Sequence, residues 1–446
     1  MAQPTSALPP GPTSPAFWQL LHYAHDPLGF LESCARRYGT PFTVRWTSYG
    51  TAVMLTDADS IRDMFRGDPH VLHSGEGNEF LSVTVGRNSV LVLDEEAHAR
   101  QRRVIVPPLK GERMRAFFEA MRSAARAEMK AWTRGSPVPM LPAMRRITLR
   151  VIMQAVLGLS PGPEMVDLER KIERVLAAGR PNRYSIAMLP FVPDKLLANS
   201  RWVPFFRQLR QLDDALFAFI ARRHKESPGN GHVFADLLAA RHEDGQPLSA
   251  IELRDIIVTL LTAGHDTTSI ALAWALEQIA PRPDVADRIA AELKQVTGGE
   301  IHEDHLDKLT YLDAAIRESM RIRTVIPFVV RLTKQPFSAG GRDYPPGVML
   351  APCSHLVHRR VDLYPEPNLF RPERFLERKF GPHEWFPFGG GNRICLGMAF
   401  ALYEMKVVLA GLFGSARFSG QSRSRSVRQG LSLGPHDGVP LIVDPI

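Results

Sequence analysis

The chain has 446 residues, of which 44% are hydrophobic and 23% are charged, and its formal net charge is +8. This length can bury a large core and enclose a cofactor, and the composition is that of an ordinary globular protein rather than a disordered one. The three cysteines, Cys34, Cys353 and Cys395, are far apart, which argues against a disulfide scaffold, a zinc cluster and an iron–sulfur centre. The basic charge would suit nucleic acid, an anionic membrane or an acidic protein partner.

Residues 1–15 are rich in proline and have neither the basic region nor the apolar stretch of a signal peptide. No run reaches the roughly eighteen apolar residues of a membrane span. We therefore expect a cytoplasmic protein without a membrane anchor. A helical pattern follows over residues 17–38, and the runs P-F-T-V-R-W and T-A-V-M-L-T predict two strands.

Residues 71–92 mix turn residues with apolar ones and predict a long loop, a feature that is often functional. His98 and Arg102 are four residues apart and share a helix face, which by itself indicates a solvated basic helix. Residues 112–160 and 163–180 predict helices with a break at Gly135. Residues 181–205 contain several prolines and large apolar groups, so they form either a lid over a pocket or a plain connection between helices.

The clearest helix is predicted between Ser249, which forms a capping box with Glu252, and Pro281, which ends the pattern. It is a rod of about 45 Å at 1.5 Å per residue, apolar on most faces, and should be buried at the centre of the molecule. Yet its middle, A-G-H-D-T-T at residues 263–268, consists mostly of poor helix formers. A local rule broken inside a buried helix indicates function, and Gly264 with the threonines predicts a kink or groove there.

Residues 284–297 predict another helix, which ends at Gly298. Beyond it lie Glu318 and Arg321 in an E-x-x-R spacing too common to carry weight alone, and F-R-P-E-R-F follows at residues 370–375. Between them, T-V-I-P-F-V-V-R predicts an extended strand. Near the C-terminus, G-L-S-L-G-P-H-D-G-V-P-L-I-V predicts a β-hairpin.

One cysteine, Cys395, lies between three glycines and an apolar helix in F-G-G-G-N-R-I-C-L-G, residues 388–397. Backbone N–H groups and the positive end of the helix dipole would favour its thiolate. The glycines lack Cβ atoms, so the backbone there could approach a flat ligand closely, and Arg393 could pair with an anionic group on that ligand. Together these features indicate haem iron held by cysteine, against the plainer alternative of a buried structural cysteine.

The pattern F-x-x-G-x-R-x-C-x-G has five fixed positions, which gives roughly one chance match in ten thousand chains of this length. In these residues the chain resembles the cytochrome P-450 family of haem-thiolate monooxygenases. The resemblance covers nearly the whole chain, because A-G-x-D-T-T, E-x-x-R and P-E-R-F occur in the family's order. It implies a mainly α-helical fold with a smaller β-rich region, a long central helix over the haem, and one haem domain over residues 1–446.

The resemblance also implies roles for the motif residues. Cys395 would be the axial ligand of the iron of haem b, and Asp266 and Thr267 would deliver protons to bound dioxygen. Glu318, Arg321 and Arg374 would form a buried network that holds the cysteine loop, since buried charges are tolerated only when paired. The residues that would contact the haem are His98, Arg102, Ala263, Gly264, Arg331, Phe388, Arg393, Cys395 and Gly397, with His98, Arg102 and Arg331 at its propionates.

The family places residues 71–92 over the substrate, the strand after E-x-x-R along the haem edge, and the C-terminal hairpin near the pocket. The residues that would line this pocket are apolar: Phe80, Leu81, Leu260, Ala263, Val325, Ile326, Phe328, Val329 and Leu433. We therefore expect a hydrophobic small-molecule substrate. The sequence does not distinguish a terpenoid, a fatty acid, a steroid and a polyketide.

The implied reaction is monooxygenation, with O₂ as co-substrate and electrons ultimately from NAD(P)H. The chain has no G-x-G-x-x-G and no cysteine cluster, so a separate ferredoxin or flavodoxin with its reductase is implied, and the protein itself is expected to be a monomer. Basic residues near the haem segments could form a docking face for that partner or simply a solvated surface. They are Arg100, Arg103, Lys110, Arg113, Arg371, Arg378 and Lys379.

Three other functions are weighed against this one. A haem sensor or electron carrier needs no proton relay, so Asp266 and Thr267 argue against it. The same pair argues against a peroxide-driven peroxygenase as the main activity. A nucleic-acid-binding protein is not supported, because no basic helix with interleaved aromatic residues and no zinc spacing is present.

Overall fold

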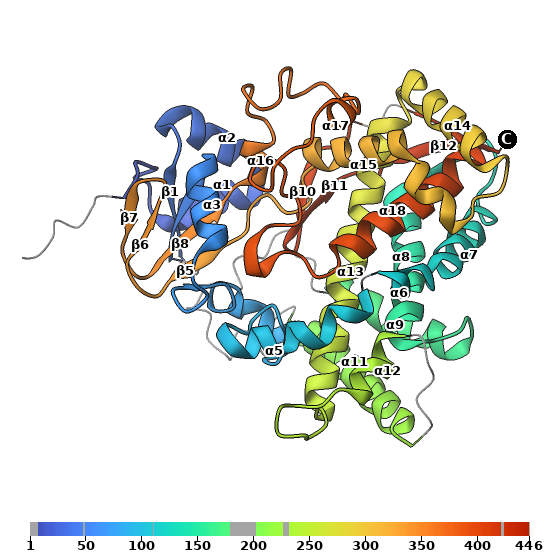
Figure 1. Ribbon diagram of the computed structural model, residues 1–446, viewed down its shortest axis with the longest axis horizontal. Coiled ribbons are helices and arrows are strands. Elements are labelled where there is room, and N and C mark those ends of the chain that lie inside the picture. The colour runs from blue at the N-terminus through green and yellow to red at the C-terminus, as the bar shows by residue number, and fades with distance from the viewer. Residues whose placement is uncertain are drawn as a thin grey trace, which may run out of the picture.

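The computed structural model describes residues 8–47, 50–109, 111–178, 202–225, 232–420 and 423–445. Helices dominate it, and a smaller β-rich part lies at the end of the molecule that carries β1, β5, β6, β7 and β8 (Figure 1). The fold class predicted from the sequence is therefore confirmed. The predicted lid lies largely outside the described residues, and its last residues belong to α11.

The largest sheet has the strand order β1-β2-β8-β5-β3. Its first two strands form an antiparallel pair, whereas β2 and β8 are parallel, with Thr51 opposite Val348. Parallel neighbours need a crossover connection, and here that connection contains most of the helices. The five strands are β1 (Phe42–Trp46), β2 (Gly50–Leu55), β3 (Leu72–His73), β5 (Arg331–Thr333) and β8 (Val348–Pro352).

The predicted C-terminal hairpin is wrong in its pairing. The hairpin joins β10 to β11 through a turn at Gly430, whose φ of 67° suits a two-residue connection. The last strand, β12, pairs instead with β4 and β9. The strands of these smaller sheets are β4 (Pro137–Pro139), β6 (Phe337–Ala339), β7 (Arg342–Tyr344), β9 (Ala416–Ser419), β10 (Ser426–Gln429), β11 (Ser432–Pro435) and β12 (Pro440–Pro445).

The N-terminal helical pattern is two helices, because Pro27 cannot continue the first one. The Asp26 carboxylate caps the second helix by accepting a hydrogen bond of 3.1 Å from the Gly29 N–H. The predicted long loop at residues 71–92 contains two short helical segments. The elements of this part are α1 (Ala16–His25), α2 (Pro27–Tyr38), α3 (Ala58–Arg66), η1 (Glu76–Leu81), α4 (Ser82–Val85), α5 (Glu95–Ile105) and η2 (Pro107–Leu109).

Helix α13 (Ala250–Ile279) runs through the helical part and packs most extensively on α8 (Figure 1). Its capping box at Ser249 is present as predicted. Among the described helices it alone is long and apolar enough to cross a membrane, and 67% of that stretch is buried, as expected of a core helix. The remaining helices are α6 (Glu112–Arg115), α7 (Phe118–Met129), α8 (Met140–Leu157), α9 (Pro163–Ala178), α11 (Trp202–Arg223), α12 (Val233–Ala239), α14 (Pro283–Thr297), η4 (Glu303–Lys308), α15 (Thr310–Ile322), α16 (Ser354–Val357), α17 (Arg374–Glu377), η5 (Gly391–Arg393) and α18 (Met398–Phe413).

The predicted kink in the middle of α13 does not break its helical ladder, which is continuous from end to end. The hydroxyl of Thr267 donates to the Ala263 carbonyl at 2.7 Å, so the local hydroxyl is satisfied within the helix. Gly264 serves close packing, because a Cβ there would lie 3.0 Å from Cδ1 of Ile152 in α8. This glycine therefore brings two helices together rather than loosening one.

The segment at residues 324–331 is not a strand, and β5 begins only at Arg331. Pro327 has no N–H to donate to a ladder. The Ser354 hydroxyl donates hydrogen bonds to the carbonyl oxygens of Ile326 and Pro327, at 3.0 and 3.1 Å. The segment is thus held by side chains and by single backbone bonds, among them the Leu433 N–H to the Val325 carbonyl at 2.8 Å.

Candidate active site

The cysteine loop folds back on itself before α18 begins. The backbone N–H of Cys395 donates to the carbonyl of Phe388 at 3.0 Å, which closes the loop. A Cβ at Gly390 would lie 2.4 Å from the ring of Phe65 in α3, and one at Gly391 would lie 2.0 Å from the Phe65 carbonyl oxygen. Two of the three glycines are therefore needed for the packing of α3 against the loop, and their approach to a flat ligand stays a prediction. Gly397 differs, because a Cβ there would meet no protein atom within 4 Å.

The thiol of Cys395 is exposed, whereas the thiols of Cys34 and Cys353 are buried. Although the side chain has accessible surface, protein surrounds it on most sides, and this burial raises its pKa, while the Gly397 N–H and the Arg102 charge act in the opposite direction. The net direction is upward, although the Gly397 N–H lowers the pKa as expected of a cysteine at the start of a helix. A cation bound at the sulfur would supply the missing stabilisation.

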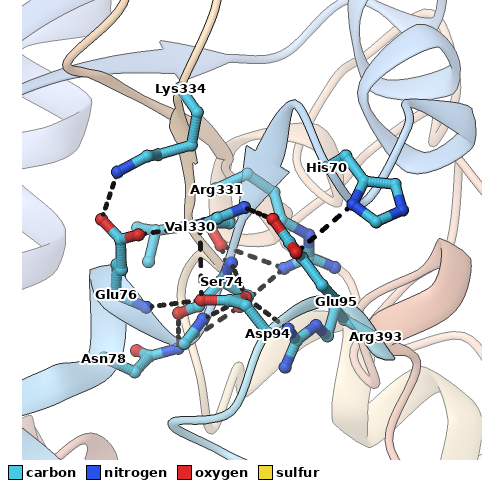
Figure 2. A network of polar contacts seen from close by, with 12 residues as sticks. His70, Ser74, Glu76, Asn78, Asp94, Glu95, Val330, Arg331, Lys334 and Arg393 are labelled. Atoms are coloured by element: carbon cyan, nitrogen blue, oxygen red, sulfur yellow. Dashed lines mark hydrogen bonds and ion pairs between the residues drawn. The ribbon is translucent and has the colours of Figure 1, made fainter. Parts of the chain in front are cut away.

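Four predicted cofactor residues form a cluster of cationic and imidazole side chains beside this loop. Arg331 donates to the Ser74 hydroxyl at 3.1 Å and to the Gly390 carbonyl at 3.3 Å, and Arg102 donates to the Ile394 carbonyl at 2.9 Å. Arg393 donates to the Val90 carbonyl at 3.2 Å and pairs with Asp94. Figure 2 shows Arg331 and Arg393 converging on the turn that contains Ser74. The cysteine loop is thus tied to three segments that are distant in sequence.

The electrostatics of this cluster favour an anionic ligand. Burial and the neighbouring Arg393 lower the pKa of Arg331 to about 9, and burial lowers the pKa of Arg393 to about 10 despite Asp94. Burial, Arg393 and Arg102 lower the pKa of His98 to about 3, so its ring is neutral at pH 7. Nε of Arg393 is buried, and within the described residues it has no hydrogen-bond partner. Surplus positive charge and an unpaired donor beside a cysteine fit the carboxylate edge of a haem.

The middle of α13 opens on an accessible space. Ala263 is exposed although Leu261 and His265 are buried, and Asp266 and Thr267 are half-buried. Asp266 is held by Arg145 of α8, whose Nε and Nη2 donate to Oδ1 at 3.1 and 3.0 Å. Both side chains are mostly shielded, with 15% and 16% of their surface exposed. Arg145 could not be singled out from the sequence, because it is one of several arginines on α8.

Arg145 also donates to the side-chain oxygen of Gln429 in β10. The adjacent strand β11 carries Leu433, whose carbonyl accepts from the Trp274 ring N–H at 3.0 Å. His265 lies away from this opening, fully buried, with Nδ1 2.9 Å from the Thr148 hydroxyl. The acid of α13, the C-terminal hairpin and α8 therefore form one polar assembly, and His265 belongs to the packing of the helix.

Glu318, Arg321 and Arg374 lie in contact, with at most 4% of each side chain exposed. The Glu318 carboxylate accepts from Nε and Nη2 of Arg321 at 2.7 and 2.8 Å and from Nε of Arg374 at 3.3 Å. Arg321 also donates to the carbonyls of His358 and Pro367, at 2.7 and 2.8 Å. All three buried charges are thus paired, as buried charges must be to be tolerated.

Five of the predicted pocket residues are divided among three apolar clusters. Leu260 and Val325 belong to the main helical core, and Ile326 packs against it. Leu433 is fully buried in β11. Phe80 and Leu81 end η1. The backbone N–H of Leu433 donates to the Val325 carbonyl, so the C-terminal hairpin is bonded to the segment that contains Val325.

Two of the predicted pocket residues are directed into other clusters. Phe328 stacks on Trp46 with ring centroids 5.6 Å apart. Val329 packs on the cluster of the β-rich end, and a Cβ at Gly389 would lie 3.5 Å from it. The alternation of an extended backbone explains this result, because successive side chains point to opposite sides.

The predicted basic docking residues are partly neutralised. Arg371 pairs with Glu377, Arg378 pairs with Glu384, and Arg103 lies 3.2 Å from Glu243. Lys110 and the side chain of Arg113 lie outside what the structure describes. Three of the described docking residues, Arg103, Arg371 and Arg378, are therefore paired with glutamates and do not form a uniformly basic face.

Comparison with known proteins identifies the family. The family model described as Cytochrome P450 matches residues 8–430. The chain belongs to the cytochrome P450 family. Among its relatives, putative cytochrome P450 135B1 of Mycobacterium tuberculosis is 34% identical over 98% of this chain and 91% of its own length. Putative cytochrome P450 138 of Mycobacterium bovis is 32% identical over 98% of this chain and 96% of its own length.

A solved cyanobacterial P450, CYP120A1 with bound retinoic acid, superimposes with a TM-score of 0.88, covering 99% of this chain and all of the other. At 24% identity this likeness shows the P450 fold. Membership of the family makes the protein a haem-thiolate monooxygenase that uses haem b and O₂, with reducing equivalents from NAD(P)H through partner proteins.

Proposed function

We propose that this P450 inserts one oxygen atom from O₂ into a hydrophobic small molecule, by hydroxylation or epoxidation. The observation that carries the proposal is the opening in the middle of α13, where Ala263 is exposed although Leu261 and His265 are buried, and where Asp266 and Thr267 are half-buried. A proton-relay acid and alcohol at an accessible stretch in the middle of a mostly buried helix serve oxygen activation, and a haem sensor or electron carrier would not need them.

We propose that the cofactor is held between this opening and the cysteine loop, as one haem domain. Cys395 would ligate the iron, and Arg102, Arg331 and Arg393 would bind the propionates, with neutral His98 donating a hydrogen bond. Ala263, Gly264, Phe388 and Gly397 would border the ring. When bound, the haem supplies the oxygen-activating chemistry. The protein orients the substrate and excludes water.

The proton path that we propose starts at Asp266. Its carboxylate would collect a proton from solvent and pass it toward Thr267. The Thr267 hydroxyl donates to the Ala263 carbonyl at 2.7 Å, so its oxygen can accept a hydrogen bond from another donor. Arg145 keeps Oδ1 of Asp266 in place with two N–H bonds.

For the substrate we propose an apolar molecule such as a terpenoid, fatty acid, steroid or polyketide, because the pocket residues predicted from the sequence are apolar. Leu260, Val325 and Ile326 lie in or against the helical core. The electrons would come from a ferredoxin or flavodoxin with its reductase. We place the protein in the cytoplasm as a monomer.

The first test is the absorption spectrum of the dithionite-reduced protein with carbon monoxide. Wild type should show the red-shifted Soret band of a thiolate-ligated haem, and Cys395→Ser should lose it. Cys353→Ser is the matched control, because Cys353 is fully buried in another cluster and should keep the band. Spin-state shifts of the oxidised protein with a panel of apolar compounds then identify the substrate class. A wild-type protein loaded with haem that lacks the band would overturn the proposal.

A further inference from the structure

The carboxylate of Asp94 is the centre of a compact polar junction (Figure 2). Oδ1 accepts hydrogen bonds from the backbone N–H groups of Ser74 and Gly75, at 2.9 and 2.8 Å, and Oδ2 accepts from the N–H of Glu76 at 2.9 Å. Arg393 donates to the same Oδ1. One side chain, with 12% of its surface exposed, therefore binds a turn and a guanidinium at once.

The two groups that Asp94 joins belong to different parts of the proposed site. The turn leads directly into η1 (Glu76–Leu81), which ends in the proposed substrate residues Phe80 and Leu81. Arg393 lies two residues before Cys395. Apart from Arg331, which bonds the Ser74 hydroxyl, none of the other proposed cofactor cations has a bond to this turn among those described.

We propose that Asp94 is a positioning residue that couples the substrate-bearing segment to the cofactor-binding arginine. When the turn is docked, three backbone N–H groups partly neutralise the carboxylate of Asp94. Arg393 is then held in place by Asp94, but much of its positive charge remains available to an anionic ligand. When the turn moves away, the same carboxylate neutralises Arg393 more fully. The position of η1 thereby sets how much positive charge the cofactor edge experiences.

The chain contains a matched comparison at the far end of the same segment. The Asp255 carboxylate accepts from the backbone N–H and the side-chain amide of Asn88, at 3.0 and 2.9 Å, and pairs with Arg254 at 2.9 Å. Asp255 thus also anchors the segment, but through an arginine of α13 that is distant in sequence from the cysteine loop. A residue that merely anchors the segment should behave like Asp255.

This inference rests on the proposed function, since it needs Arg393 at the cofactor, but one of its two readouts is independent of catalysis. The first readout is hydrogen exchange of the Ser74–Glu76 amides in the full-length protein, with haem content matched between variants. Asp94→Asn should speed exchange there on the order of tenfold, the loss expected for charge-assisted bonds. Asp255→Asn should leave these amides as in wild type and speed exchange near Asn88 instead.

Coupling is reciprocal, so the turn must also respond to a change at the arginine. Arg393→Lys should slow exchange of the same three amides, because a carboxylate with fewer bonds to the arginine binds the turn more strongly. Arg102→Lys, which changes a guanidinium whose described bond goes to the Ile394 carbonyl, should leave their exchange as in wild type. This pair also covers the case in which Asp94→Asn fails to fold.

The second readout is the reduction potential of the haem-loaded protein. Removing the negative charge of Asp94 should raise it, while Asp255→Asn should leave it at the wild-type value. Equal potentials in these two variants, or equal exchange of the turn in Arg393→Lys and Arg102→Lys, would show that Asp94 is only an anchor. A protein with no thiolate-type carbonyl spectrum but with coupled exchange would overturn the monooxygenase proposal instead.

Discussion

Single arginines organise much of the candidate site, each by joining a carboxylate to groups from other segments. Arg321 joins Glu318 to two backbone carbonyls, and Arg145 joins Asp266 to Gln429. The planar guanidinium suits this role because its five donors point in fixed directions. A lysine at either position could not make the same set of bonds. Arg145 deserves a direct test, because it contacts the proposed proton donor.

Replacing Arg145 with methionine should destabilise the protein and impair the reaction. Asp266 would lose two N–H bonds inside the protein, at a cost of about 1–3 kcal/mol in the free energy of unfolding. Misplacement of the carboxylate should lower product formation by up to about a hundredfold. Urea unfolding and product formed per O₂ consumed measure the two effects.

Arg150→Met is the control on the same helix, since Arg150 lies 3.6 Å from Glu169 in a half-exposed pair. It should cost less than about 1 kcal/mol and leave product formation unchanged. Equal losses of activity in the two variants would contradict a role for Arg145 at Asp266.

Among the elements, the helices α13 and α18 show two uses of glycine. In α13, Gly264 faces Ile152 of α8 at close range, whereas Gly411 in α18 has no atom within 4 Å of its missing Cβ. The first glycine lets two helices approach, and the second only weakens its own helix. The same residue type therefore has opposite effects on stability at the two positions.

Gly264→Val should destabilise the protein by about 1–3 kcal/mol, since the added carbons overlap the Ile152 side chain. Adding Ile152→Ala to this variant should recover part of the loss, because space is opened at the contact. Gly411→Ala, as control, should stabilise the protein by about 0.5–1 kcal/mol. Thermal and urea unfolding of wild type, Gly264→Val, Ile152→Ala, the double variant and Gly411→Ala measure these differences. Additive effects of the Gly264 and Ile152 changes would contradict the contact.

In the cysteine loop, two glycine substitutions distinguish an effect on the stability of the fold from an effect on haem binding. Gly391 has a φ of 65° and would bring a Cβ into the Phe65 backbone, so Gly391→Ala should cost about 1–3 kcal/mol even in the protein without haem. Gly397 has a φ of −90° and open space around it. Gly397→Ala should change stability without haem by less than about 0.5 kcal/mol yet weaken haem retention, measured by transfer to apomyoglobin. Unchanged retention would remove Gly397 from the proposed haem contacts.

Elements with local signals were predictable from the sequence, and elements fixed by distant partners were not. The start of α13 is encoded by Ser249 and Glu252 themselves, and the end of α14 by Gly298, whose φ is 63°. By contrast, residues 324–331 have the composition of a strand, but two of their carbonyl oxygens accept hydrogen bonds from the Ser354 side chain and not from a neighbouring strand. In the site, the motifs predicted the loop of Cys395 and the contacts of Glu318. Asp94 and Arg145 were missed, since only the folded chain shows what they contact.

In the molecule as a whole, buried histidines link stability to pH. Burial and the charge of Arg359 lower the pKa of His355 to about 4, and burial lowers the pKa of His358 well below its usual range. Nε2 of His358 accepts the N–H of Phe386 at 3.1 Å, which requires the neutral ring. The unfolded chain binds protons at these histidines below about pH 6.5, whereas the folded protein does not.

The free energy of unfolding should therefore fall as the pH is lowered from about 6.5 toward 4. Each of these histidines contributes up to about 1.4 kcal/mol per pH unit in that window, because the unfolded state binds the extra proton. Urea unfolding at pH 7.5, 6.5, 5.5 and 4.5 measures the slope. His355→Gln should make it shallower. A slope unaffected by His355→Gln would contradict this origin.

The network around Arg321 also bears on how the protein matures during synthesis. Arg321 leaves the ribosome together with Glu318, but the carbonyls of His358 and Pro367 and the guanidinium of Arg374 follow only later. Until they arrive, Arg321 must stay hydrated, since burying it without its partners is costly. The nascent chain therefore cannot complete this network until Arg374 has left the ribosome, when most of the polypeptide has been translated.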